Sequence, residues 1–327
     1  MTTPISTSFI ANDLDMLAEF DGHVAILIGA DKKLGDAARR VNRLTKGGVA
    51  RFLDSDGFAK MDEGTAKILA YPAGMIAASV VIIRLSRGAT LVDARRAGAA
   101  ISKASVGRDI LLASGQQKNL AEIVLGVTLR GYTFSDHKTA DACPSGTLSV
   151  MTKQVDAARE KSTQVQALAQ GVFFTRDLVN EPANVLTTTE FASRLQDLTD
   201  LGVKVQVLDE DELEKLGMRT LLAVGIGSES PSKVVVMQWN GGGDEKPFAL
   251  IGKGVVFDTG GISMKPAAGM EDMTMDMGGA GVVSGVMKTL ALRKAKANVV
   301  GVVGLVENMP DGKATRPGDV VRSMKGD

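Results

Sequence analysis

The sequence predicts an α/β fold in which a smaller N-terminal α/β domain is joined by a long helix to a second α/β domain with a largely parallel, helix-flanked sheet. Short apolar runs alternate with stretches of helical periodicity through both halves of the chain, which is typical of layered α/β structures. The 327 residues, 44% of them hydrophobic, favour two domains over one. We expect the domains at 1–150 and 181–327, with the connecting helix at 151–180.

The first domain is predicted from apolar runs that are bounded by turns and separated by helix-period segments. Each run is short enough for a buried strand, and each intervening segment is long enough for a helix that crosses back over the sheet. The expected strands are Val24–Ile28, SVVIIRL from Ser79 and DILLAS from Asp109, and the expected helices are Gly35–Leu44, Leu91–Ser105 and Asn119–Tyr132.

A linker and a long helix are expected next. The segment from Asp141 to Val150 collects Pro, Ser, Gly and Thr without periodicity, which predicts a linker. Residues 151–180 lack proline and predict the helix. This helix should end before NEPAN, because Pro182 disfavours helical geometry at Glu181.

The second domain repeats the alternation. Its continuous apolar runs favour a buried, largely parallel sheet. After the first run, DEDELEKLG places acids at a helix start and Gly217 just past its end, the order that the helix dipole and C-capping favour. The expected strands begin at Val203, Lys233, Phe248 and Asn298.

Composition excludes several classes of protein. Basic and acidic residues number 38 each, so nucleic acid is not the expected partner. Cys143 is the only cysteine, so no intrachain disulfide and no zinc site of paired CxxC motifs is possible, and a reducing cytoplasm fits best. The start of the chain shows no export signal, and the longest apolar run, near Met75 to Ile83, is too short to span a bilayer. We expect a cytoplasmic protein.

The best candidate site is LIGKGVVFDTGGISMKPAAGMEDMTMDMGGAGVVSGVMK. Ionisable groups stand there among glycines directly after a buried apolar strand, where burying a charge is costly. The loop after a strand's carboxyl end is the usual ligand position in open α/β sheets. The groups are Lys253, Asp258, Lys265, Asp272 and Asp276.

Each of these residues also has a structural interpretation. Asp276 precedes an apolar helix and suits an N-cap, which stabilises by about 1 kcal/mol. Asp258 suits a turn beside Gly260 and Gly261, and the lysines suit solvated or ion-paired positions. Two carboxylates with glycine-rich backbone around them could instead hold divalent metals. Core filling is favoured for most of the methionines, with a tolerant apolar pocket as the alternative; they are Met264, Met270, Met273, Met275 and Met277.

Other catalytic motifs are absent. Gly252-Lys253 is not part of a phosphate loop, because Pro247 stands at the first required glycine and Gly254 at the Ser/Thr position. No GxSxG motif occurs, and both histidines, His23 and His137, lie in the first domain. A Ser-His hydrolase is therefore not expected.

Three consecutive segments resemble signatures of the cytosolic leucyl aminopeptidase family: GKGVVFDTGGISMKP, MTMDMGGAGVVSGVMK and VENMPDGKATRPGDVV. The resemblance extends from Leu129 to Asp327. It implies that Lys253, Asp258 and Asp276 are metal ligands, with Asp258 bridging two ions. It also implies that Lys265 is catalytic and close to the substrate carbonyl, and that Met273 lies in the pocket for the substrate's first side chain.

The activity that the resemblance implies is hydrolysis of N-terminal residues, preferably leucine, from peptides with a free N-terminus by water activated at two metal ions. The implied cofactors are zinc or manganese, with magnesium possible at the exchangeable position, and a bicarbonate ion as general base. A homo-hexamer is implied as the assembly, and no membrane.

The sequence stops before the NTDAEGRL segment, which in the family supplies a further Asp and Glu to the metals. We therefore expect the catalytic domain to be incomplete at its C-terminal end and this chain alone to be weak or inactive. The alternative is a non-catalytic assembly or binding protein, or an inactive fragment, that retains the aminopeptidase fold.

Overall fold

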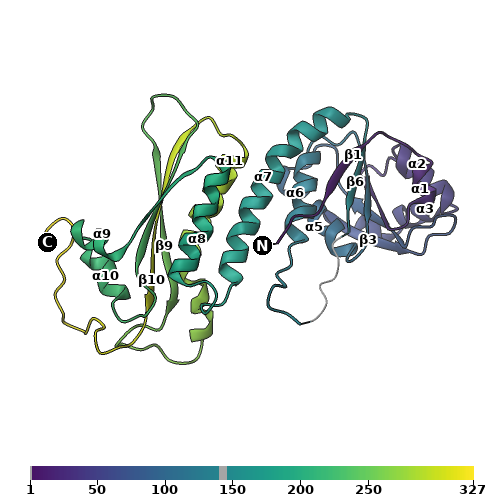
Figure 1. The fold of residues 1–327 in the computed structure, drawn as a ribbon. Coiled ribbons are helices and arrows are strands. Elements are labelled where there is room, and N and C mark those ends of the chain that lie inside the picture. Colours follow the sequence, from purple (N-terminus) through teal and green to yellow (C-terminus); the bar gives the residue numbers. More distant parts are fainter. Residues whose placement is uncertain (1, 140–145) are drawn as a thin grey trace. The chain divides into compact units, whose positions relative to one another are not determined.

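The computed structural model describes residues 2–139 and 146–327, and these divide into two compact units (Figure 1). The N-terminal unit contains 3–169. The C-terminal unit contains 170–327 together with Thr2. The division falls inside helix α7 (Val155–Asn180), so this helix contributes residues to both units.

The N-terminal unit has a sheet of six strands in the order β1-β6-β5-β2-β4-β3. Its neighbouring strands pair in parallel except for β3 and β4, which are antiparallel. The strands are β1 (Thr7–Ile10), β2 (His23–Ile28), β3 (Thr65–Ala70), β4 (Ser79–Arg84), β5 (Ile110–Gly115) and β6 (Leu148–Thr152). The helices are α1 (Met16–Glu19), α2 (Asp36–Leu44), α3 (Gly48–Leu53), α4 (Asp56–Ala59), α5 (Leu91–Ala104) and α6 (Leu120–Arg130).

Both faces of this sheet are buried, which explains its unbroken apolar strands. Alternate residues of one strand enter different cores: Val24 and Ile26 of β2 pack with α2 and α3, whereas Ala25 packs with α5 and α6. The strands at Val24, Ser79 and Asp109 and the three helices predicted from the sequence are all present within a few residues of the expected ends.

The predicted linker at Asp141–Val150 requires a correction. Residues 141–145, including Cys143, lie outside the described residues. The later part is strand β6, which pairs with both β1 and β5, and the long helix begins at Val155 rather than at residue 151. LSVMT is too short to show a period of its own, and only pairing with two distant strands makes it a strand.

The C-terminal unit has a sheet of four strands in the order β7-β8-β10-β9. Its strands are β7 (Lys204–Leu208), β8 (Lys233–Asn240), β9 (Phe248–Asp258) and β10 (Asn298–Asn308). Its helical segments are the end of α7, α8 (Thr188–Gln196), η1 (Asp197–Leu201), α9 (Glu210–Lys215), α10 (Arg219–Gly225), η2 (Met270–Met277) and α11 (Gly278–Leu292).

The α/β class is confirmed, but the direction of pairing in this second sheet differs from the expectation. Among the described strands, β9 and β10 are parallel, whereas β7–β8 and β8–β10 are antiparallel. An apolar run indicates that a strand is buried, but it does not show whether the strand pairs in parallel or antiparallel. The β9–β10 pair is parallel because α11 carries the chain back over the sheet between them.

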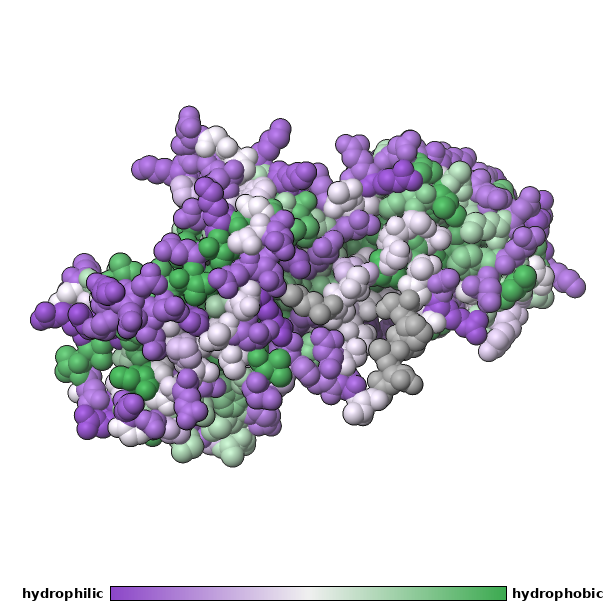
Figure 2. All heavy atoms as spheres, in the orientation of Figure 1, coloured by the Kyte–Doolittle hydropathy of each residue, from purple (hydrophilic) through white to green (hydrophobic). Residues whose placement is uncertain are grey.

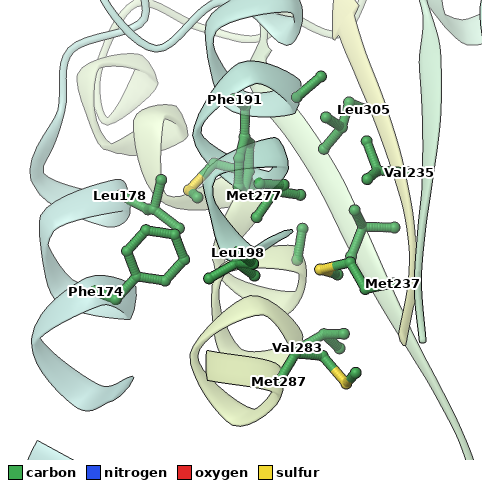
Figure 3. Packing of buried hydrophobic residues seen from close by; sticks show 14 of the residues in the cluster. Phe174, Leu178, Phe191, Leu198, Val235, Met237, Met277, Val283, Met287 and Leu305 are labelled. Carbon is green, nitrogen blue, oxygen red and sulfur yellow. The ribbon is translucent and has the colours of Figure 1, made fainter. Parts of the chain in front are cut away.

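One core fills the space between this sheet and helices α7, α8 and α11 (Figure 3). Phe174 and Phe191 of the helices, Met237 and Leu305 of the sheet, and Met277 just before α11 all belong to this core. The helix after β7 also follows the prediction, because α9 ends before Gly217, whose φ of 73° is the left-handed geometry of a helix C-terminus.

The surface drawn in Figure 2 is a mixture of hydrophilic and apolar residues, with the apolar ones in separate groups. Within the described ranges, none of the helices is both long enough and apolar enough to cross a bilayer.

Candidate functional site

The candidate site begins at the ends of the two parallel strands of the C-terminal sheet. Lys253 pairs with Gly304, and Asp258 pairs with Asn308. Gly304 and Asn308 are four residues apart on β10 and therefore share a face, so their partners share it too. Lys253 and Asp258 are five residues apart, and they reach the same face because a register shift inserts one extra residue in β9.

The turn after β9 folds the following loop back onto Asp258. Asp258 Oδ1 accepts a hydrogen bond of 2.9 Å from the N–H of Gly260. Gly260 and Gly261 have φ of 90° and 68°, so this turn requires residues without a Cβ. The N–H of Lys265 then donates to the carbonyl of Thr259 at 2.8 Å, which returns the Lys265 side chain to the strand end.

Lys265 joins two of the other predicted residues. Its Nζ donates to Asp258 Oδ2 at 2.7 Å and to the sulfur of Met273 at 3.2 Å. Met273 lies in η2, which follows the loop. A cation, a carboxylate and a soft apolar side chain are thus in direct contact.

Lys253 and Asp276 form the second ion pair of the site. They meet because β9 and the start of α11 approach closely: a Cβ on Gly252 would lie 2.7 Å from the Cα of Ala280. Asp276 does not cap α11, since Met277 is the N-cap residue and no side chain accepts a hydrogen bond there. Asp276 Oδ2 is buried and has no hydrogen-bond partner among the described residues.

Asn308 is a site residue that the sequence did not reveal. Its Nδ2 donates to Asp258 Oδ1 at 2.7 Å, and its backbone carbonyl accepts from the N–H and Oγ1 of Thr259. β10 ends at Asn308, next to the end of β9. Residues at the adjacent carboxyl ends of parallel strands lie at one edge of the sheet, and this position is the signal that could have identified Asn308.

The hydrogen bonds around Asp258 keep its carboxylate charged. Partial burial raises the pKa of Asp258, but hydrogen bonds from Lys265, Gly260 and Asn308 outweigh burial, so the net pKa lies below its ordinary value. Asp258 is therefore held as an anion with fixed orientation.

The structure brings together Lys253 with Asp276, and Asp258 with Lys265 and Met273, but leaves Asp272 exposed. Core filling holds for Met277, which is fully buried, whereas Met264 and Met275 are 61% and 57% exposed. The methionines of this segment therefore serve different purposes.

The donor set fits part of a divalent metal site. Asp258, Asp276 and the Lys253 amine are hard or borderline ligands. The partnerless Oδ2 of Asp276 is a buried acceptor of the kind that a cation would satisfy. No cluster of three His, Cys, Asp or Glu side chains occurs in the described part of the chain, so two carboxylates and one amine are the set that these residues offer.

Comparison with known proteins identifies similar chains. Residues 173–327 match the catalytic domain of the cytosol aminopeptidase family. The chain is 58% identical over its whole length to a probable cytosol aminopeptidase from Dinoroseobacter shibae, and 53% identical over its whole length to one from Cereibacter sphaeroides. It covers 67% of each of these relatives.

Two solved structures are also similar. A mutant of tomato leucine aminopeptidase shares the fold with a TM-score of 0.82 at 21% identity, over 99% of this chain and 67% of that one. The bottromycin maturation enzyme BotP in complex with Mn has a TM-score of 0.74 at 28% identity, over 94% of this chain and 64% of that one. The chain thus spans about two thirds of the length of the proteins it matches.

Proposed function

Because this chain belongs to the cytosol aminopeptidase family, we propose that the whole protein is a metal-dependent aminopeptidase that removes N-terminal residues, preferably leucine, from peptides. One observation carries the proposal for this chain. Two residues of β9, Lys253 in the middle of the strand and Asp258 at its end, each form an ion pair with a residue of the segment that follows, and the Oδ2 of Asp276 is buried without a partner among the described residues.

We assign the binding of two divalent ions, zinc or manganese with magnesium as a further candidate, to Lys253, Asp258 and Asp276. By the resemblance to the family, Asp258 would be the ligand that the two ions share. The ions supply Lewis-acid chemistry, which polarises a carbonyl and makes water nucleophilic at neutral pH. A lysine amine binds a metal only after it has lost its proton, so Lys253 would have to give up its proton and its ion pair with Asp276 to serve as a ligand.

Lys265 is assigned to the substrate. Its ammonium lies against Asp258 and Met273, so a carbonyl oxygen placed beside the bridging carboxylate would come within its reach. A fixed cation at that point stabilises the negative charge that develops on the oxygen during attack by water. Met273, in contact with the same amine, is assigned to the apolar pocket for the first side chain.

The test uses the full-length protein and a chromogenic leucine amide. We expect release of leucine with zinc, manganese or magnesium, and none after removal of metal with a chelator. Asp276→Ala should abolish metal binding and lower turnover at least about a thousandfold, equivalent to about 4 kcal/mol. Asp272→Ala changes an exposed carboxylate four residues earlier and serves as the matched control, with wild-type activity expected.

Two outcomes would count against the enzyme. One is no release of leucine with any of the three metals, and the other is an Asp276→Ala protein that remains folded and binds metal as before. Either would favour a non-catalytic assembly or binding role for the fold. We further propose a homo-hexamer, which light scattering of the full-length protein checks; a stable monomer would contradict it.

A further inference from the structure

The N-terminal unit has two adjoining cavities at the carboxyl ends of its parallel strands. The first, of about 460 Å³, lies between the loops after β4, β5 and β6. The second, of about 750 Å³, lies between the loops after β2, β4 and β5. Both are lined by Arg87, Gly115, Gln116 and Gln117, so they are two parts of one crevice. This is the position where open α/β sheets bind ligands, and the volumes are those of small-molecule sites.

The first cavity is positively charged. Four cations line it, namely Arg87, Lys118, Lys153 and Lys161, and no carboxylate does. Lys153 is paired with Asp36 at 3.3 Å. Arg87, Lys118 and Lys161 form no ion pair with any residue in the described ranges. In a chain of zero net charge, this local excess favours an anion.

The backbone adds to the same field. Helices α6 and α7 both begin at this cavity: Leu120 and Ala121 of the first, and Ala157 and Ala158 of the second, line it. The first N–H groups of a helix have no partner within the helix and carry partial positive charge. The side chain of Asn119 does not cap α6, and its amide donates instead to the carbonyl of Ala89 at 3.0 Å. The partial positive charge of the two helix starts therefore adds to that of the side-chain cations.

The second cavity has a different character. Apolar side chains of β2 and the following loop, including Ile26 and Leu34, form part of its wall. Asp31 and Asp36 also line it; Asp31 is paired with Lys33, and Asp36 is paired with both Arg39 and Lys153. The oxygens of these paired carboxylates can still accept hydrogen bonds from hydroxyl or amino groups.

We propose that this crevice binds a nucleoside phosphate, with the phosphates in the first cavity and the sugar and base in the second. The unopposed cations and two helix starts match the charged end of such a ligand. The apolar wall and the acceptors of Asp31 and Asp36 match its flat apolar ring and its hydroxyl groups. This site lies in the N-terminal unit and uses none of the residues assigned to the aminopeptidase reaction.

The experiment is calorimetric titration of the full protein with ADP in a buffer that contains EDTA, so that the nucleotide is not bound through a metal. We expect saturable binding to one site that weakens as sodium chloride is raised. The double variant Arg87→Gln, Lys118→Gln should bind at least tenfold more weakly. The matched control is Lys60→Gln, Lys67→Gln, which removes the same charge from exposed lysines of the same unit outside both cavities and should bind as the wild type does.

Two further titrations make the result specific. Inorganic phosphate alone should bind more weakly than ADP and compete with it; equal affinity for both would overturn the nucleoside assignment. Asp258→Asn should leave ADP binding unchanged, whatever it does to peptide hydrolysis. Absence of saturable ADP binding, or an affinity of the Arg87, Lys118 double variant within twofold of the wild type, would overturn the proposal.

Discussion

The two units carry different arrangements of charge beside their sheets. In the C-terminal unit, Lys253 meets Asp276 and Lys265 meets Asp258, so each charge is opposed by another. In the N-terminal unit, Arg87 and Lys118 stand over a cavity without a carboxylate in its lining. Both units place polar groups beyond the ends of parallel strands. In the C-terminal unit the charges are paired with each other, whereas in the N-terminal unit positive charge remains without a partner among the described residues.

This difference shows that sheet topology selects where a ligand binds, and the loop residues select which ligand. Carboxylates that are held in ion pairs can exchange a lysine for a divalent cation. Cations without partners, at the starts of helices, suit an anion. The two units should therefore respond independently to substitutions, and four predictions test this, ordered from the largest expected effect.

Replacing Lys265 should affect the C-terminal chemistry most. Lys265→Ala removes the cation beside Asp258 and should lower turnover of the full-length protein by about 10²- to 10³-fold, about 3–4 kcal/mol of transition-state stabilisation. Metal affinity, measured by competition with a chromogenic chelator, should change by about tenfold at most, because Gly260 and Asn308 still hold the Asp258 carboxylate. Lys246→Ala, an exposed lysine just before β9, is the control. Turnover within twofold of the wild type would remove Lys265 from the mechanism.

Gly98 tests the stability of the N-terminal unit alone. A Cβ on Gly98 would lie 2.0 Å from the carbonyl oxygen of Ile123, because α5 and α6 pack backbone to backbone. Gly98→Ala should therefore lower the free energy of unfolding by about 2–3 kcal/mol. Gly88→Ala, where a Cβ would meet no atom within 4 Å, is the control in thermal denaturation. Equal melting temperatures for the two variants would show that α5 and α6 can move apart without a measurable loss of stability.

These features differ in how far the sequence could predict them. The buried strands were predicted because apolar runs between turns report burial locally. The short strand at Leu148–Thr152 was not, because only its partners at Thr7 and Ile110 make it a strand. Lys253, Asp258, Asp276, Lys265 and Met273 were selected as candidates by motif, although their roles remain predictions.

What the sequence could not supply is the non-local geometry. The meeting of Lys253 with Asp276 depends on the close approach of β9 to α11 at Gly252. The contact of Asn308 with Asp258 depends on a register shift between two strands fifty residues apart. The cations of the N-terminal crevice come from three separate loops and α7, so no continuous sequence motif contains them.

Asn308 should have a smaller effect than Lys265. Asn308→Ala removes one of three hydrogen bonds that orient Asp258, and supporting residues of this kind typically change metal affinity by about 10- to 100-fold. We expect the lower end, about tenfold, because Lys265 and Gly260 still hold the carboxylate. Asn298→Ala, at the opposite end of β10, should leave metal affinity unchanged. Equal affinities for both variants would leave Asn308 with a purely structural role.

The smallest predicted effect is on the way stability changes with pH. Both histidines belong to the N-terminal unit, so their protonation affects that unit. Burial and the nearby charge of Arg108 lower the pKa of His23 below its ordinary value, and its Nδ1 lies 2.8 Å from Ser79 Oγ. Between the lowered pKa and about 6.5, the unfolded chain takes up a proton that the folded chain does not. Stability should therefore fall slightly as the pH drops below about 6.5, and His23→Gln should reduce that slope in urea titrations. Between pH 7.5 and 8.5 the free energy of unfolding should change with pH equally in the variant and the wild type. If stability below about pH 6.5 falls as steeply in the variant as in the wild type, groups other than His23 cause the fall.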